Sequence, residues 1–189
     1  EKQPDVLCLQ ETKVSNKDFP FEPFNALGYG VKIYGQKAYN GVAILSKSEF
    51  IDCRNGFEGE LSEKRDLEIF DEQKRIISAY INGVRIINVY VPNGSSLGSE
   101  KFRYKIEWLS QLDEYIKKQQ LRGEYTCLMG DFNIALDNKD IHDPNKYEGG
   151  IMASKMEREA LKNILDKKFI DSFRVFEQLP GHWSWWDYR

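Results

Sequence analysis

Two β-rich runs joined by Asn82-Gly83 constrain the fold of this chain more than any other feature. The runs cover residues 75–81 and 84–91 and are rich in isoleucine, valine and tyrosine. Asn-Gly between two such runs is the strongest short-range signal for a two-residue hairpin turn. The sequence therefore predicts an antiparallel hairpin whose second strand places four side chains on one face: Val84, Ile86, Asn88 and Tyr90.

Apolar patterning predicts further strands and two helices. Val6–Leu9 is typical of a strand buried on both faces, and Gly41–Leu45 is also typical of a buried strand. Residues 54–74 are mostly polar and indicate a connecting loop. Residues 100–119 have an apolar stripe at helical spacing, and Ser154-Lys155-Met156-Glu157 has the capping-box form that begins a helix. Strands and helices in this order favour an α+β sandwich over a regular alternation of strand and helix.

Composition narrows the class of protein. With 189 residues, 41% of them hydrophobic, the chain can bury one sizeable core, and we expect a single domain. No apolar run is long enough for a membrane span and no signal peptide is visible, so we expect a cytoplasmic protein. Three cysteines without metal-type spacing indicate neither a disulfide framework nor a zinc site. A net charge of -3 means that any binding of nucleic acid must be local.

Gly130-Asp131-Phe132-Asn133 places a carboxylate and a carboxamide two residues apart, directly after the apolar run 125–129. Positions i and i+2 of extended backbone point the same way, so we expect Asp131 and Asn133 to converge, with Gly130 allowing a sharp exit from the strand. Such a pair suits a hard cation or a phosphate. The alternative is an Asx-rich turn in which both side chains cap local backbone.

Polar groups also stand at the ends of two other predicted strands. Glu11 follows the first strand, and Tyr90 and Asn93 lie at the end of the hairpin. Mg²⁺ takes carboxylate and carbonyl oxygens together with several waters, which suits Glu11. Asp131 can orient or deprotonate a water, Asn133 can hold that aspartate or a phosphate oxygen, and a tyrosine hydroxyl can stabilise phosphoryl charge. Taken singly, Glu11 also fits a surface charge, and Tyr90 a half-buried strand aromatic.

Four motifs resemble those of the exonuclease III-type AP endonucleases, which belong to the endonuclease/exonuclease/phosphatase superfamily. They occur in the family's order and span nearly the whole chain: Leu9-Gln10-Glu11-Thr12-Lys13, Asn88-Val89-Tyr90-Val91-Pro92-Asn93-Gly94, Gly130-Asp131-Phe132-Asn133 and Trp185-Trp186-Asp187-Tyr188-Arg189. Gly-Asp-Xaa-Asn is shared with inositol phosphatases and sphingomyelinases. The Tyr-Val-Pro-Asn-Gly strand end is closer to the DNA-repair branch.

The resemblance implies a DNase I-like, four-layer αββα sandwich that hydrolyses the phosphodiester 5′ to an abasic site with Mg²⁺ or Mn²⁺. It also implies 3′-phosphodiesterase or 3′-to-5′ exonuclease activity, on double-stranded DNA bound by a monomer. By the same resemblance, Glu11 binds the metal and Tyr90 contacts the phosphate. Asp131 and Asn133 flank the attacking water at the metal site.

The resemblance further assigns contacts with DNA. Asn93 matches a position that contacts the substrate phosphate or backbone, and Lys13 and Lys101 are candidates for phosphate contacts. Trp185 resembles the aromatic wall of a pocket for the flipped abasic sugar. Two alternatives stand beside these roles: Lys101 can belong to a solvated charged helix face with Arg103 and Lys105, and Trp185 to an aromatic core cluster with Trp183 and Trp186.

Departures from the family's pattern affect the expected activity. The chain starts after a Thr-Trp-Asn strand of such enzymes and ends before their Arg-Ile-Asp and Ser-Asp-His motifs, and neither His142 nor His182 has the context of the missing histidine. We therefore expect residues 1–189 to form one domain that lacks its first strand and its C-terminal catalytic segment, and to be inactive or weakly active alone. The alternatives are a phosphatase or phosphodiesterase on a non-DNA substrate, and a non-catalytic binding module.

Overall fold

The computed structural model describes residues 2–61 and 67–184. These residues divide into two compact units. The first unit comprises the chain up to Val91 together with Glu114–Phe132, and the second comprises Pro92–Asp113 and the chain from Asn133 onwards. The boundary between the units falls within the long helix α4 (Glu100–Gln120), whose residues up to Asp113 belong to the second unit and whose residues from Glu114 belong to the first.

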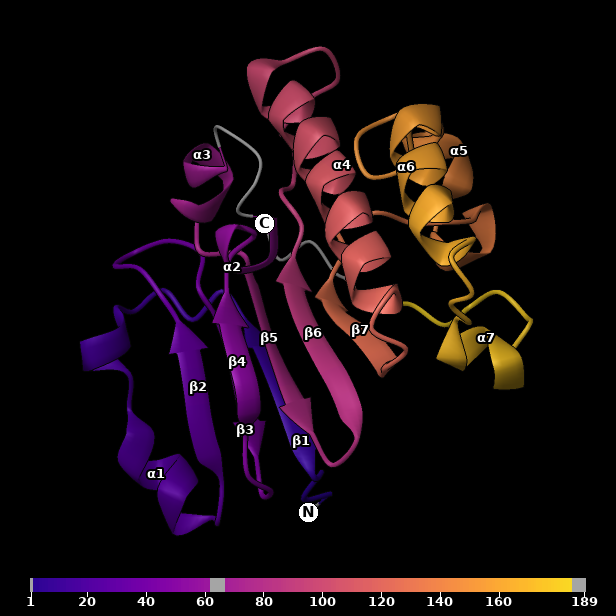
Figure 1. The fold of residues 1–189 in the computed structure, drawn as a ribbon. Helices are drawn as coiled ribbons and strands as arrows, with labels where there is room; N and C mark the ends of the chain where they lie inside the picture. Colours follow the sequence, from indigo (N-terminus) through magenta and orange to yellow (C-terminus); the bar gives the residue numbers. More distant parts are fainter. Residues whose placement is uncertain (1, 62–66, 185–189) are drawn as a thin grey trace. The chain divides into compact units, whose positions relative to one another are not determined.

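The first unit contains two β-sheets, coloured indigo to magenta in Figure 1 apart from the orange strand β7. One has the order β1-β3-β2 and is antiparallel throughout, and the other has the order β4-β5-β6-β7 and ends in a parallel pair. The strands are β1 (Val6–Gln10), β2 (Gly30–Tyr34), β3 (Val42–Ser46), β4 (Ile51–Asn55), β5 (Ile76–Ile81), β6 (Val84–Tyr90) and β7 (Tyr125–Asp131). Short helical turns connect them: η1 (Asn16–Asp18), α1 (Phe21–Ala26), α2 (Glu58–Leu61) and α3 (Glu68–Asp71).

The two sheets face each other across an apolar core. Alternate residues of β3, β5 and β6 form this core: Val42, Ile44, Ile77, Ala79, Ile81 and Ile86. The outer face of the first sheet packs on η1 and α1 through Phe19, Phe21 and Phe24. On the outer face of the second sheet, Tyr115 of α4 lies 2.8 Å from the Ser78 hydroxyl. The first unit is thus layered as helix, sheet, sheet and helix, which confirms the predicted α+β sandwich.

The predicted hairpin is confirmed in detail. β5 and β6 pair around Asn82 and Gly83, which have φ of 49° and 84°, as the two-residue turn requires. Val84, Ile86 and Tyr90 all pack on the core between the sheets, so the predicted common face of β6 points at the other sheet. Asn88 on this face is completely buried and is hydrogen bonded by its side chain to β1 and β3.

Two of the predicted segments differ from the structure. β1 is only half-buried, and Leu7 is 36% exposed, because β1 is an edge strand that pairs with β3 alone. The predicted loop 54–74 contains α2 and α3 in its described part, because the buried Asp71 carboxylate accepts from the amides of Phe57 and Glu58 and folds the segment back.

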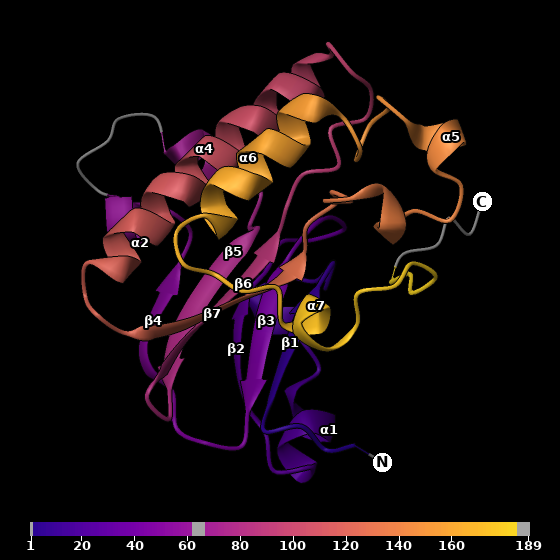
Figure 2. The ribbon, with the colours of Figure 1, turned by 90° about the vertical axis from the view of Figure 1, so that its right-hand side faces the viewer.

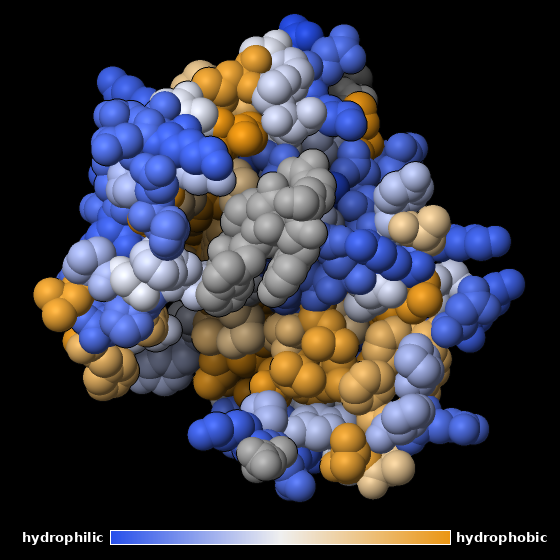
Figure 3. All heavy atoms as spheres, turned by 180° about the vertical axis from the view of Figure 1, so that it is seen from behind, coloured by the Kyte–Doolittle hydropathy of each residue, from blue (hydrophilic) through white to orange (hydrophobic). Residues whose placement is uncertain are grey.

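The surface seen from behind carries a group of hydrophobic residues (Figure 3).

The second unit is helical. The first part of α4 packs on α6 (Lys155–Leu165), and the two helices run side by side in Figure 2. Ser154 caps α6 and Glu157 completes the capping box, as the sequence predicts. Among its described residues, up to position 184, this unit also contains the short helices η2 (Asn138–Asp140), α5 (Pro144–Tyr147) and α7 (Ser172–Phe176).

Gly130 is not at the exit of β7, as the sequence suggested, but inside it. Its φ is +139°, and a Cβ atom there would lie 1.9 Å from the Val89 carbonyl oxygen of the paired strand β6. The glycine therefore permits the close approach of β6 and β7, and the strand continues to Asp131.

We predict that Gly130→Ala destabilises the protein far more than Gly123→Ala. Gly123 also has positive φ, of +71°, but nothing lies within 4 Å of the added methyl group, so it serves as the matched control. Denaturant unfolding should show a loss of about 1–2 kcal/mol for Gly123→Ala. For Gly130→Ala it should show more than about 4 kcal/mol, or no folded protein. Equal losses for the two variants would contradict the assigned close approach.

Candidate active site

The side chain of Glu11, the residue directly after β1, does not point in the direction that strand alternation predicts. Gln10, the last residue of β1, points into the space between the sheets, where its amide donates to Asn88 Oδ1 at 2.7 Å. Continued strand alternation would turn Glu11 to the opposite side. Instead Glu11 has φ of +52°, and its Oε1 accepts a hydrogen bond of 2.9 Å from the Tyr90 hydroxyl. Positive φ in a non-glycine residue persists only where the surroundings enforce it.

Tyr90 is the last residue of β6, and the side chain of Arg75 packs against its ring. The Arg75 guanidinium carbon lies 4.4 Å from the centre of the Tyr90 ring, and Arg75 also donates to the Tyr90 carbonyl at 3.2 Å. The sequence reasoning did not identify Arg75. The sequence does contain a signal for this contact. If the two strands pair outward from the Asn82-Gly83 turn, Arg75 lies opposite Tyr90 in the hairpin.

Asp131 is placed beside Tyr90 by the register of the parallel pair. Tyr90 of β6 is the partner of Asp131 of β7, and the Val91 amide donates to the Asp131 carbonyl at 2.8 Å. Paired residues of neighbouring strands project to the same face of a sheet. Glu11, Tyr90 and Asp131, three of the predicted site residues, therefore lie together at one end of the first unit.

Local charges set the protonation of this group. The Lys13 ammonium, 2.7 Å from Glu11 Oε2, lowers the pKa of the Glu11 carboxyl against the effect of burial, and the Tyr90 hydroxyl lowers it further. Burial, together with the Glu11 carboxylate, raises the pKa of Tyr90 to about 12. The pair thus holds an ionised carboxylate against a protonated phenol at neutral pH, and Lys13 itself lies at the site as an exposed cation.

The second unit carries the remaining described candidates. Asn93 Nδ2 lies 3.4 Å from Asn133 Oδ1, and the Asn133 side chain is buried. Asn133 has φ of +48°, so the backbone is no longer extended there and the predicted i, i+2 alternation does not hold. The convergence of Asn133 with Asp131 stays a prediction. Lys101 lies exposed in the first turn of α4, and Trp185 lies outside the described residues.

The predicted solvated face of residues 101–105 is wrong at one position. Lys101 and Arg103 are exposed, but Lys105 is completely buried and forms an ion pair with Glu157. A lysine is buried only when its charge is fully compensated. Neither helical periodicity nor composition reveals the carboxylate, since it comes from a helix more than fifty residues away in the sequence.

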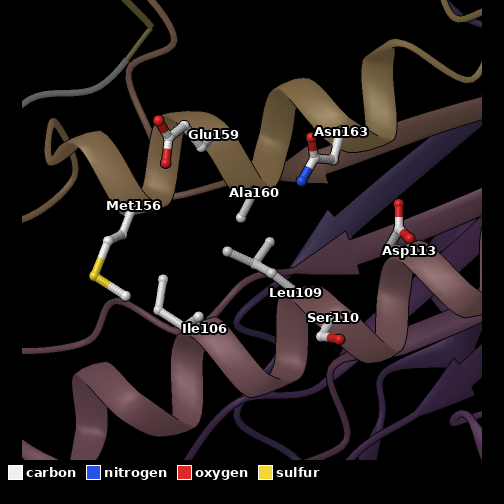
Figure 4. Close-up of a pocket in the computed structure, with 8 residues that line it drawn as sticks. All are labelled: Ile106, Leu109, Ser110, Asp113, Met156, Glu159, Ala160 and Asn163. Atoms are coloured by element: carbon white, nitrogen blue, oxygen red, sulfur yellow. The ribbon is translucent and has the colours of Figure 1, made fainter.

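The groove between α4 and α6 has a different character. Figure 4 shows its apolar floor, and the cavity measures about 310 Å³. Its lining consists of Ile106, Leu109, Ser110, Asp113, Met156, Glu159, Ala160 and Asn163. Within the described part of the chain, no predicted site residue is among those that line this groove.

The donor set of the first unit fits a hard divalent ion. In residues 2–61 and 67–184, no group of three or more histidine, cysteine, aspartate or glutamate side chains is placed to hold a metal. Mg²⁺, however, keeps several waters and typically takes only one or two protein carboxylates. Glu11 is ionised and 42% exposed, and Asp131 lies at the same end of the unit. These two oxygen donors match that requirement.

Comparison with known proteins defines the class to which this fold and site belong. Residues 1–189 match the Endonuclease/Exonuclease/phosphatase family over their whole length, and the chain belongs to this family.

Among the described residues, no helix is both long enough and apolar enough to cross a membrane.

Two relatives of this chain are named as exodeoxyribonucleases. The chain is 33% identical to the exodeoxyribonuclease of Bacillus subtilis, with 100% of this chain and 71% of the relative covered. It is 36% identical to exodeoxyribonuclease III of Haemophilus influenzae, with 99% and 72% covered. These relatives place the chain among the exonuclease III-type members that its motifs resemble.

Solved structures give the same result. An AP endonuclease from Archaeoglobus fulgidus superposes with a TM-score of 0.90 at 36% identity, covering 100% of this chain and 70% of that one. A 3′ phosphatase, NExo, from Neisseria bound to a product DNA hairpin superposes with a TM-score of 0.87 at 37% identity, covering 98% and 69%. The DNase I-like α+β fold predicted from the sequence is thereby confirmed.

We predict that Tyr90 stays protonated well above pH 10, because burial and the Glu11 carboxylate raise its pKa to about 12. NMR titration of ring-labelled tyrosine, with Tyr90→Phe to assign the signal, measures this directly. Since a raised pKa favours the protonated form in the fold, this stabilisation is complete below pH 10 and is lost as the pH rises towards 12.

Glu11→Gln provides the second arm of the same experiment. Removing the carboxylate charge should lower the pKa of Tyr90, while burial continues to hold it above the ordinary value. A Tyr90 signal that titrates at the ordinary value in the unaltered protein would refute the assigned contact.

Proposed function

We propose that this chain carries part of the active site of a metal-dependent DNA-repair phosphodiesterase that incises 5′ to abasic sites. By the same proposal, the site also has 3′-phosphodiesterase or 3′-to-5′ exonuclease activity. The observation that carries the proposal is the grouping of ionised Glu11, protonated Tyr90 and Asp131 at one end of the first unit. The exodeoxyribonucleases, the AP endonuclease and the 3′ phosphatase among its relatives support the choice of DNA as substrate.

Each residue of the group has a task in hydrolysis of a phosphodiester. A water oxygen forms the new bond to phosphorus, and the 3′ oxygen of the preceding nucleotide leaves. Asp131 orients this water and takes its proton, which is general-base catalysis. The Tyr90 hydroxyl donates to a non-bridging phosphoryl oxygen, where negative charge grows in the transition state. Tyr90 suits this task because its raised pKa keeps the proton in place.

Mg²⁺ or Mn²⁺ is the cofactor that this donor set favours. Glu11 would hold the ion together with Asp131, and Asn133 stays the third ligand predicted from the sequence. When bound, such an ion polarises the phosphoryl oxygens and stabilises the leaving oxygen. The Glu11 carboxylate is already ionised, so no proton has to leave before it binds a cation, and the exposed Lys13 ammonium would move aside from Oε2.

Two carboxamides and two lysines are the proposed contacts with DNA. Asn93 and Asn133 hydrogen bond to substrate phosphate or to the attacking water, while Lys13 and Lys101 contact phosphates. With a net charge of -3, the protein has to bind DNA locally through such residues rather than over its surface. The Trp185 pocket wall, a monomeric state and a cytoplasmic location stay predictions from the sequence.

The proposal includes a requirement for further chain. The relatives exceed this chain in length, which covers 71% and 72% of the two exodeoxyribonucleases. β1 is half-buried at a sheet edge, and Leu7 is 36% exposed. We propose that residues 1–189 are one domain whose full activity needs flanking segments, including an additional strand and a C-terminal segment that supplies a histidine and an aspartate.

We predict that the protein extended by its flanking codons cuts an abasic-site duplex in the presence of Mg²⁺. Glu11→Gln and Asp131→Asn should each lower kcat by about 100-fold or more, because the first removes the carboxylate that would hold the metal ion and the second removes the general base. Glu159→Gln, which removes an exposed carboxylate on α6, is the matched control and should leave the rate unchanged.

Substrate choice separates the alternatives. An extended protein that leaves the abasic duplex intact but hydrolyses a soluble phosphomonoester would replace the repair function with that of a phosphatase. Failure on both substrates, with DNA still bound, would identify a non-catalytic binding module. Either result sinks the proposed function.

A further inference from the structure

We propose that Lys105 and Glu157 act as a positioning pair that sets the geometry of the Asn93 and Asn133 carboxamides. This inference rests on the proposed function, since it concerns two residues of the proposed site. Neither Lys105 nor Glu157 is itself a candidate for contact with substrate, because both side chains are completely buried. All four residues belong to the second unit.

Lys105 uses its ammonium group to join two separate loops. Its Nζ donates to the main-chain carbonyl of Asn93 at 3.2 Å and to that of Asn133 at 2.7 Å. The third bond goes to Glu157 Oε1 at 2.5 Å. A lysine ammonium has three donors, so all three are used. One buried cation thus holds the backbone of both candidate residues at once.

The Glu157 carboxylate is also held by several hydrogen bonds. Its Oε1 also accepts from the Met152 amide at 3.0 Å. Its Oε2 accepts from the Ser154 amide at 3.1 Å and from the Ser154 hydroxyl at 2.5 Å. Each carboxylate oxygen therefore has two donors, and α6 itself fixes the carboxylate through its capping box. The Lys105 ammonium is anchored to a rigid helix start rather than to a mobile side chain.

The loops that receive these bonds have little freedom left. Asn133 is in the left-handed region with φ of +48°, and its side chain is buried next to the Asn93 amide. Gly94 follows Asn93 with φ of +90°, and a Cβ atom there would lie 3.1 Å from Lys105 Cδ. The lysine stem therefore occupies the space beside Gly94, and the position of Asn93 depends on this packing as well as on the ammonium.

Stability alone does not explain why this ion pair is present. Replacing a buried ion pair by apolar or neutral residues of similar volume is often tolerated, so a buried pair is weak evidence for a stabilising role. Here the cation contacts the carbonyls of the two candidate residues themselves. A nearby pair gives the comparison: Lys167 and Asp113 also link α4 to the chain following α6, but do so without contacting Asn93 or Asn133 in any described hydrogen bond.

The test compares two double variants of the extended protein on the abasic-site duplex. Lys105→Met with Glu157→Gln removes both charges together, which avoids the unpaired buried charge that a single change would leave. Lys167→Met with Asp113→Asn is the control, which removes a second, less buried ion pair of the same unit. We expect the first to keep its KM within about threefold but to lose about 100-fold in kcat, the typical effect of misplacing catalytic groups by about 1 Å. The control should retain both constants.

A second measurement does not depend on activity. The side-chain amide NMR signals of Asn93 and Asn133 should shift and broaden in the Lys105/Glu157 variant and stay in place in the control. If the Lys105/Glu157 variant fails to fold, Lys105→Arg, which keeps the charge but changes the geometry, takes its place in both measurements.

The outcomes separate the two proposals. Normal kcat and unshifted amide signals in a folded Lys105/Glu157 variant would overturn the positioning role while the proposed function stands. Loss of kcat to the same extent in the control would also overturn it, because any ion pair of the unit would then suffice. If the unaltered protein does not cut DNA, the proposed function fails, and the amide signals alone decide whether the pair positions the two asparagines.

Discussion

The side chain of Asn88, buried between the two sheets, ties together the strands on which the candidate site depends. Its amide donates to the carbonyls of Leu9 and Ala43 at 2.9 Å, and its oxygen accepts from Gln10. A buried amide left without partners would be costly, so these bonds strongly favour one alignment of the sheets. They lie two residues before Tyr90 on β6 and directly before Glu11 at the end of β1. The contact between Glu11 and Tyr90 follows from this alignment.

That contact determines the electrostatics of the site. A carboxylate and a phenol at 2.9 Å favour one ionised and one protonated partner, and the Lys13 cation lowers the pKa of the Glu11 carboxyl. The Arg75 cation also acts to lower the pKa of Tyr90, but burial and the Glu11 carboxylate outweigh it. The result is a group that already has the charge needed to hold a metal ion and the proton needed to donate to a phosphoryl oxygen. Preorganisation of this kind contributes most where charge develops in the transition state. The strained backbone of Glu11 is part of the same arrangement, because it turns the carboxylate to the side of Tyr90.

Local signals in the sequence predicted much of this architecture. Asn82-Gly83 and the capping box at Ser154 act through backbone geometry within a few residues, and both the hairpin and α6 were predicted correctly. The group of Glu11, Tyr90 and Asp131 was predicted from strand ends and from the resemblance to a family. What sequence could not show depends on partners distant in the chain. The sequence pattern predicts a solvated Lys105, whereas its environment is set by the ion pair with Glu157. It also predicts Gly130 at a strand exit, whereas the position is set by the close approach of Val89. Strands β2 and β4, with their mixed composition, have no clear period of their own and take their conformation from pairing with β3 and β5.

We propose that Glu11 is the metal-holding carboxylate of a phosphodiesterase. Anomalous diffraction from crystals of the extended protein grown with Mn²⁺ tests this role of Glu11. An anomalous peak should lie within direct coordination distance of the Glu11 carboxylate, with the Lys13 ammonium displaced from it. An ordered Mn²⁺ bound elsewhere, with the Glu11–Lys13 pair intact in a protein that still cuts DNA, would exclude Glu11 as the metal ligand.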